Sequence, residues 1–162
     1  MRWQWTNRFD QKARRLADRH YSRRSPGARQ FAPHGRCVVL RTPAADAVWV
    51  TSWQWPTSHV MHAWPGAWTC ACFRNESPHV SSELIREAVA ATRALWPEVP
   101  APGMVTFVDP SKVRHKRDPG RCFRKAGFRP AGATANGLVA LQLFPEDMPP
   151  AEKPLGLLLA SV

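Results

Sequence analysis

The chain has 162 residues, of which 44% are hydrophobic, and it carries 23 Lys and Arg against 12 Asp and Glu, a formal net charge of +11. This length suits one domain with a sizeable core, and no apolar run approaches the roughly 18 residues that a membrane span requires. The amino-terminal residues lack the apolar segment of a secretory signal, and the four cysteines have no CxxC spacing, so we expect an intracellular protein with free thiols.

The hydrophobic pattern predicts a single α/β domain with a mixed, mostly antiparallel central sheet flanked by helices. This domain is expected over residues 1–145, with a tail over 146–162. In chain order we expect a helix, a two-strand hairpin, a strand, a long helix, a strand, a short helix and a last strand. Their expected ranges are 7–20, 36–42 with 47–55, 67–75, 81–96, 103–109, 120–128 and 137–144.

The first predicted helix ends next to a histidine and the only tyrosine of the chain. Apolar residues at helical spacing place His20 on the inward stripe of this helix, with Phe9, Ala13 and Leu16. The helix dipole favours a protonated imidazole at this carboxyl-terminal end. A core or capping histidine is the structural alternative to a catalytic one.

The positive charge is concentrated in two segments. Residues 1–41 carry eleven Lys and Arg against two Asp and Glu, and residues 111–129 carry eight against one. Two basic segments that flank a near-neutral core predict a surface for a polyanion. A surface that only keeps the protein soluble is the alternative.

Cysteine and tryptophan positions add two weaker expectations. Cys70 and Cys72 lie two residues apart in a predicted strand, so we expect both on one face, as core packing rather than as a metal site. Four tryptophans are placed near the expected cleft, where each either stacks on a base or belongs to the core: Trp49, Trp53, Trp55 and Trp64.

The order of elements resembles that of the GCN5-related N-acetyltransferase (GNAT) superfamily, and DPGRCFRKAGFRPAGATANGLVALQL, residues 118–143, resembles its carboxyl-terminal part. Members of that superfamily usually hold the pyrophosphate of acetyl-CoA with a glycine-rich loop before the central helix. The corresponding stretch here, FRNESPHVSSEL at 73–84, contains no glycine. Either the cofactor is bound differently or it is not acetyl-CoA.

Several short motifs are together similar to the Mom family of phage DNA-modification proteins, which are diverged relatives of the acetyltransferases. These motifs are RHYSRRSPG, FRNES, VSSELI, and TFVDP ahead of DPGRCF. The resemblance implies a transferase that protects phage DNA from restriction, in the cytoplasm of an infected bacterial host. It would attach a carbamoylmethyl-type group to N6 of adenine in double-stranded DNA, with possible use of iron. The donor would be acetyl-CoA or another small molecule, and the enzyme a monomer or homodimer.

The resemblance, together with the chemistry of the residue types, assigns expected roles to individual side chains. The expected catalytic residues are His20, Tyr21, Asp109, Arg74 and Glu76, with His20 as base or metal ligand and Tyr21 as proton donor or stacking ring. A cofactor anion is expected on Arg74, Asn75, Ser81 and Ser82, and a metal ion on His20, Asp109 and Cys122. DNA phosphates are expected on Arg23, Arg24, Arg29, Lys112, Arg114, Lys116, Arg117 and Arg121.

Each assignment has a structural alternative. Arg74 and Glu76 also fit a surface ion pair, Asp109 a turn cap before proline, and Ser81 or Ser82 an ordinary helix N-cap. Two other functions remain open: an acyl-CoA N-acyltransferase for a protein or small amine, and a nucleic-acid-binding protein without catalysis.

Overall fold

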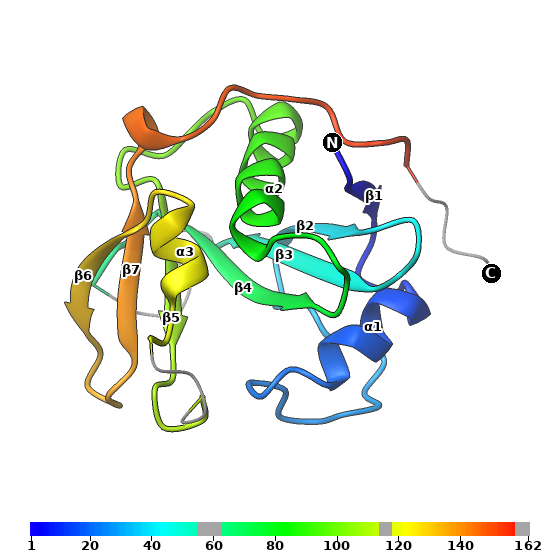
Figure 1. Cartoon of the computed structure of the whole chain (residues 1–162), viewed down its shortest axis with the longest axis horizontal. Helices are drawn as coiled ribbons and strands as arrows, with labels where there is room; N and C mark the ends of the chain where they lie inside the picture. The colour runs from blue at the N-terminus through cyan, green and yellow to red at the C-terminus, as the bar shows by residue number, and fades with distance from the viewer. Residues whose placement is uncertain (55–62, 114–117, 158–162) are drawn as a thin grey trace.

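The computed structural model describes residues 1–54, 63–113 and 118–157, which form a seven-stranded sheet with helices on both faces (Figure 1). The helices are α1 (Gln11–Asp18), α2 (Ser81–Leu95) and α3 (Arg121–Lys125), followed by the 3₁₀ helix η1 (Pro145–Asp147). The strands are β1 (Gln4–Thr6), β2 (Arg36–Arg41), β3 (Ala47–Trp53), β4 (Trp68–Asn75), β5 (Met104–Val108), β6 (Arg129–Ala133) and β7 (Val139–Leu143). Their spatial order is β1-β2-β3-β4-β5-β7-β6.

Every neighbouring pair of strands is antiparallel except β4 and β5, which α2 connects in parallel. The expected α/β class with a mixed, mostly antiparallel sheet is therefore confirmed. Strands β1 and β6 were not predicted. β1 has only three residues, and β6 interrupts its pattern with Pro130 and Gly132, so neither shows the alternation by which a strand is recognised.

The two faces of the sheet carry separate apolar clusters. On one face, α2 buries Leu84, Ile85, Ala88 and Val89 completely, together with Trp49 from β3. On the other face, α1 supplies the buried residues Ala13, Leu16 and Ala17 to a smaller cluster with β2, β3 and β4. The sheet is thus covered by α2 and α3 on one side and by α1 on the other (Figure 1).

Helix α1 is shorter than expected because Asp10 begins it. The Asp10 carboxylate accepts hydrogen bonds from the backbone N–H groups of Lys12 and Ala13, which is the geometry of an N-cap. Phe9 precedes the helix and is 50% exposed, so its predicted place on the inward stripe is wrong.

Strand β4 contains a bulge at the middle of its pairing with β3. Val50 pairs with Cys72, but the next residue, Thr51, pairs with Cys70, which leaves Ala71 as the extra residue. Cys70 consequently packs in the α2-side cluster and Cys72 in the α1-side cluster. The expectation that both sulfurs share one face is therefore wrong.

Strands β4 and β5 pair only at their beginnings. The paired residues are Trp68–Cys70 and Met104–Thr106, although β4 continues to Asn75 and β5 to Val108. Figure 1 shows the two arrows turning away from each other beyond this point. The divergent end of β4 and β5 is the part of the sheet next to which the candidate site lies.

The carboxyl-terminal segment contacts the domain as far as Leu155. The backbone N–H of Glu152 donates to the carbonyl of Ala90 in α2, and Leu155 pairs with β1 through Trp3 and Trp5. The red trace in Figure 1 accordingly passes over α2 toward β1. None of the helices in the described ranges is long and apolar enough to cross a bilayer.

Candidate functional site

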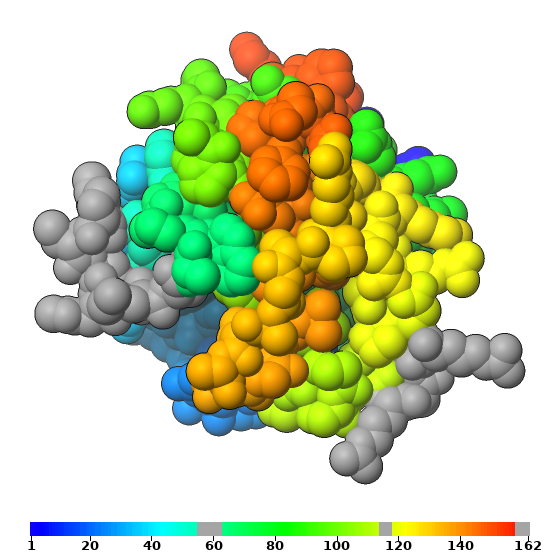
Figure 2. All heavy atoms as spheres, turned by 90° about the vertical axis from the view of Figure 1, so that its left-hand side faces the viewer, coloured from blue at the N-terminus to red at the C-terminus, as the bar shows by residue number. Residues whose placement is uncertain are grey.

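Two basic segments that are far apart in the sequence meet beside the divergent end of β4 and β5. The arm, residues 19–31, follows α1, and the second segment, whose described residues are 109–113 and 118–121, follows β5. The Tyr21 hydroxyl in the arm accepts a hydrogen bond of 3.3 Å from the backbone N–H of Asp109. Figures 1 and 2 both show the arm in blue and the segment after β5 in yellow-green along the lower edge.

Tyr21 is half-buried in this junction and packs against the α2-side cluster. Its ring stacks on the imidazole of His20, with 4.5 Å between ring centroids. Burial raises the pKa of Tyr21 above its ordinary value of 10.0, so the phenol is neutral at physiological pH. Because its oxygen accepts from Asp109, the hydroxyl hydrogen points elsewhere, and Tyr21 is suited to donate a hydrogen bond or a proton.

His20 lies beyond the end of α1 and is partly exposed, so it does not occupy the inward stripe of the helix. Its Nδ1 atom accepts from the backbone N–H of Ser22 at 3.2 Å and lies 2.7 Å from the Ser22 hydroxyl. A neutral imidazole with this acceptor carries its hydrogen on Nε2. The arrangement fits a histidine that stacks on Tyr21 and orients the arm.

The Asp109 carboxylate closes the turn after β5. It accepts from the backbone N–H of Ser111 at 3.0 Å and from its hydroxyl at 2.6 Å. These Ser111 bonds, the side-chain one foremost, lower the pKa of Asp109. The geometry is that of the turn cap named above as the alternative, and the backbone N–H of Asp109, rather than its carboxylate, faces Tyr21.

The predicted metal site is not assembled. Within residues 1–54, 63–113 and 118–157, no group of three or more His, Cys, Asp or Glu side chains is placed to share a metal ion. The Nδ1 atom of His20 and the Oδ1 atom of Asp109 are already used by Ser22 and Ser111. Among the described residues, His20, Asp109 and Cys122 therefore do not form the predicted metal site, and iron dependence stays a prediction of the family resemblance.

Glu76 links the end of α1 to the end of β4. Its carboxylate accepts from Nε and Nη2 of Arg19, both at 2.8 Å, and from Nε of Arg74. These bonds, Arg19 first, lower the pKa of Glu76 to about 2. Arg74 also donates to the carbonyl of Arg19 at 2.7 Å. Glu76 thus orients two arginines, and both remain partly open to solvent, with side-chain exposures of 50% for Arg19 and 34% for Arg74.

The glycine-free loop before α2 is organised by Asn75. Its Nδ2 donates to the carbonyl of His79 and to Ser81 Oγ, and its Oδ1 accepts from the backbone N–H and the hydroxyl of Ser77. Val80 occupies the N-cap position, where no side chain caps the helix, so the prediction of Ser81 or Ser82 as N-cap is wrong. In the described part of the chain, no N-cap side chain accepts from the first N–H groups of α2.

The arm is held in shape by Asp18, whose importance the sequence did not reveal. Its carboxylate accepts from Arg23 Nε at 2.7 Å and from the backbone N–H of Gly27 at 3.1 Å. Arg23 also donates to the carbonyl of Ala28, and its side chain is only 12% exposed. Arg23 is therefore a strut inside the arm, whereas Arg24 points to solvent.

The remaining predicted contacts divide by exposure. Four of the expected DNA-binding residues are exposed: Arg24, Arg29, Lys112 and Arg121. Three others, Arg114, Lys116 and Arg117, lie outside the described residues, as does Trp55. Trp49 is fully buried and belongs to the core, whereas Trp53 and Trp64 are partly exposed, Trp53 with the Arg36 guanidinium 4.0 Å from its ring centroid.

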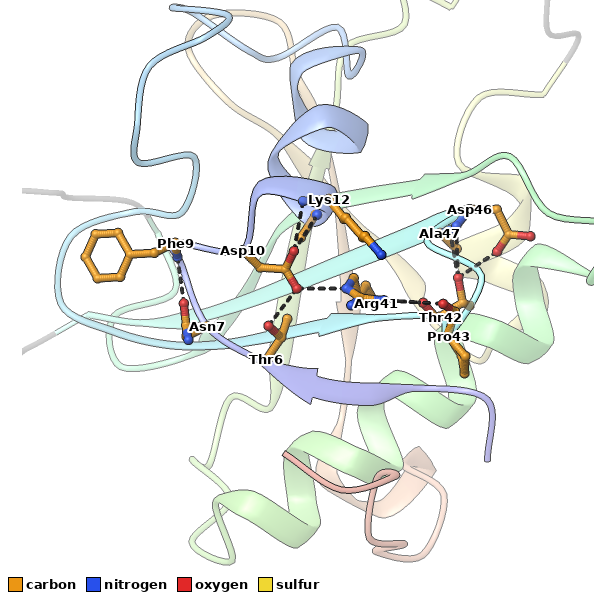
Figure 3. A network of polar contacts seen from close by, with 11 residues as sticks. Thr6, Asn7, Phe9, Asp10, Lys12, Arg41, Thr42, Pro43, Asp46 and Ala47 are labelled. Carbon is orange, nitrogen blue, oxygen red and sulfur yellow. Dashed lines mark hydrogen bonds and ion pairs between the residues drawn. The ribbon is translucent and has the colours of Figure 1, made fainter. Parts of the chain in front are cut away.

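A buried ion pair that the sequence analysis did not identify fixes the beginning of α1 (Figure 3). Asp10 Oδ2 accepts from Arg41 Nε at 2.7 Å and from the Thr6 hydroxyl at 2.8 Å. The same guanidinium donates to the carbonyls of Thr42 and Pro43. This network joins β1, α1 and the β2–β3 turn, so it positions the helix from which the arm emerges.

Comparison of the chain with protein-family models, with curated proteins and with solved structures finds no match. The resemblance to the Mom family and to the GNAT superfamily thus stays a prediction that the sequence motifs carry.

Proposed function

We propose that this protein is a Mom-like transferase that modifies the N6 amino group of adenine in DNA. The observation that carries the proposal is the position of Tyr21. Its neutral hydroxyl lies at the divergent end of β4 and β5 and is bonded to Asp109, so that the basic arm meets the start of the second basic segment there. A hydrogen-bond donor between two cationic segments is the arrangement that chemistry on a phosphate-flanked base requires.

The reaction imposes two demands on such a site. The base must leave the stack or be met where it is unpaired, because N6 is otherwise held in the duplex. Transfer then forms a bond from N6 to a donor carbon and breaks the bond from that carbon to its leaving group. The proton that N6 loses ends on the leaving group, or on Tyr21 where Tyr21 has protonated the leaving group. Tyr21, protonated because of its burial, supplies a hydrogen bond or proton to the leaving group.

The donor is proposed to bind at the end of β4, where α2 begins. Support comes from the partly exposed guanidinium of Arg74 and from the uncapped first turn of α2, where Ser82 is partly exposed. Asn75 contributes by fixing the loop through Ser77 and Ser81. The donor site is therefore expected to prefer an anionic group, whether that group belongs to acetyl-CoA or to another small molecule.

The test is nucleoside mass spectrometry on plasmid DNA from cells that express the protein or its Tyr21→Phe variant. We expect a new deoxyadenosine-derived mass with the wild type and its loss with Tyr21→Phe, because the variant keeps the ring but removes the hydroxyl. The melting temperature and the affinity for a DNA duplex serve as controls and should change little, since only one 3.3 Å hydrogen bond is lost.

Two other results would each favour one of the alternative functions. DNA that stays unmodified, combined with saturable acetyl-CoA binding and acylation of an amine, would establish the acyltransferase alternative. If the folded wild type leaves DNA unmodified, and wild type and Tyr21→Phe bind duplexes equally well, the result would favour a binding protein without catalysis.

A further inference from the structure

A second basic surface lies between α1 and the turn that joins β2 to β3. It is a hollow of about 250 Å³ lined by Lys12, Arg15, Leu16, Arg19, Ala44 and Ala45. Three of these six side chains are cationic and none is acidic. Since one water occupies about 30 Å³ of liquid, the hollow has room for a phosphate group and several waters.

The cations of the hollow come from a single helical face. Lys12, Arg15 and Arg19 follow one another at spacings of three and four residues, which places them in one row along the helix. Figure 3 shows the Lys12 side chain extending from α1 toward the β2–β3 turn. The opposite wall of the hollow is formed by Ala44 and Ala45, whose small side chains leave space in front of the cations.

Two of the three cations are unpaired within the described part of the chain. Lys12 and Arg15 are exposed, and no described side chain or carbonyl accepts a hydrogen bond from either ammonium or guanidinium. The neighbouring acids are already engaged, Asp10 by Arg41 and Asp46 by Thr42. The positive charge of Lys12 and Arg15 is therefore not neutralised by these acids, whereas Arg19 is paired with Glu76.

We propose that this hollow binds a phosphate of the DNA backbone beside the modified base. The inference rests on the proposed function, since it names a further contact for the same DNA. Arg19 connects the two places: it lines the hollow and lies two residues before Tyr21. The row from Lys12 to Arg19 spans roughly 10 Å of helix, about three base-pair steps of DNA. The duplex would thus follow α1 from the arm to the hollow.

The experiment measures duplex affinity at several salt concentrations by fluorescence anisotropy. The wild type is compared with the double variant Lys12→Gln/Arg15→Gln and with a charge-matched control, Arg86→Gln/Lys153→Gln. Both control residues are also exposed, but they lie in α2 and in the carboxyl-terminal segment, outside the hollow and outside the two basic segments. A third variant, Ala44→Glu, adds a negative charge to the wall and keeps both cations.

Loss of one phosphate contact should make the slope of log affinity against log salt less negative by about 0.9. It should also weaken binding about five- to tenfold near 0.1 M salt. We expect this result for Lys12→Gln/Arg15→Gln, a weakening in the same direction for Ala44→Glu, and neither for the control. Because all the substituted residues are exposed, melting temperatures should stay close to that of the wild type.

A second experiment replaces the duplex with inorganic pyrophosphate. It tests whether the hollow binds the phosphate of a small molecule instead of a DNA phosphate. If pyrophosphate protects the wild type but not Lys12→Gln/Arg15→Gln against thermal unfolding, while duplex binding is unchanged in that variant, the hollow serves a small phosphorylated ligand and the inference is overturned. An unchanged salt slope with no effect of pyrophosphate overturns it as well.

Failure of this inference and failure of the proposed function give different results. A changed slope in a protein that leaves DNA unmodified removes only the catalytic proposal. Modified DNA with an unchanged slope removes only the phosphate site. Absence of any duplex binding removes both.

Discussion

The two ends of α1 are both fastened to the sheet by ion pairs, but in opposite surroundings. At the first end, the side chains of Asp10 and Arg41 are only 9% and 10% exposed. At the other end, Glu76 holds two arginines whose side chains are 34% and 50% exposed. A buried pair is costly to break, whereas an exposed pair contributes little and yields easily to another anion. The buried end thus positions the helix and leaves the exposed end available for ligands.

The largest effect should follow from breaking the buried end. Asp10→Ala removes the N-cap of α1 and leaves the Arg41 guanidinium buried without its counter-charge. We expect the free energy of unfolding to fall by about 3–5 kcal/mol, measured by urea denaturation. A loss below about 1 kcal/mol would show that the network in Figure 3 does not anchor the helix.

Glu76→Gln is the counterpart at the exposed end, since it also removes one carboxylate charge from an ion pair with arginine. Its cost should stay under about 1 kcal/mol and should shrink further at high salt. The folded pKa of about 2 lies below the ordinary value of 4.5, so this contribution is present above pH 4.5 and disappears as the pH falls toward 2. The wild type and Glu76→Gln should therefore converge in stability at acidic pH.

An effect smaller than that of Asp10→Ala separates two adjacent arginines of the arm. Arg23 is bound by Asp18 and by the carbonyl of Ala28, and Arg24 is exposed. Arg23→Ala should lower stability by about 1–2 kcal/mol through lost hydrogen bonds to a charged group. Arg24→Ala should leave stability unchanged and reduce the salt slope of duplex binding by about 0.9. Urea denaturation and anisotropy on both variants measure the two quantities.

The reverse pattern would contradict this division of roles. If Arg24→Ala unfolded the arm, or if Arg23→Ala changed the salt slope in a protein of unchanged stability, Arg23 rather than Arg24 would be the residue in contact with DNA.

The sequence was sufficient for elements whose pattern is local. The two strand-like apolar runs around residues 43–46 and the helical spacing of Leu84, Ile85, Ala88 and Val89 identified the β2–β3 hairpin and the central helix. The pattern failed where a single residue decided the geometry. Asp10 moved the start of α1, and the extra residue Ala71 turned Cys72 to the other face.

The candidate site was harder to predict because its contacts are not local. Tyr21 was selected as the only tyrosine beside two arginines, but its partner, the backbone N–H of Asp109, is 88 residues away. The pairing of Arg23 with Asp18 and the pairing of Arg19 with Glu76 are likewise invisible to charge counts. Charge located the basic segments, and only the fold distinguished struts from exposed cations.

The smallest effect concerns the proton of Tyr21, and it links the exposed end of α1 to the proposed chemistry. Because Tyr21 is the only tyrosine, the phenolate absorbance near 295 nm reports this residue alone. Burial raises its folded pKa above 10.0, so the midpoint should lie higher in the native protein than in denaturant. The folded state then holds the proton more tightly than the unfolded chain, and stability should fall as the pH rises above 10. The variant Tyr21→Phe supplies the baseline, with no transition in this range. Equal midpoints in native and denatured protein would mean that the hydroxyl is fully solvated, and Tyr21 would then lack the sheltered position from which it is proposed to donate.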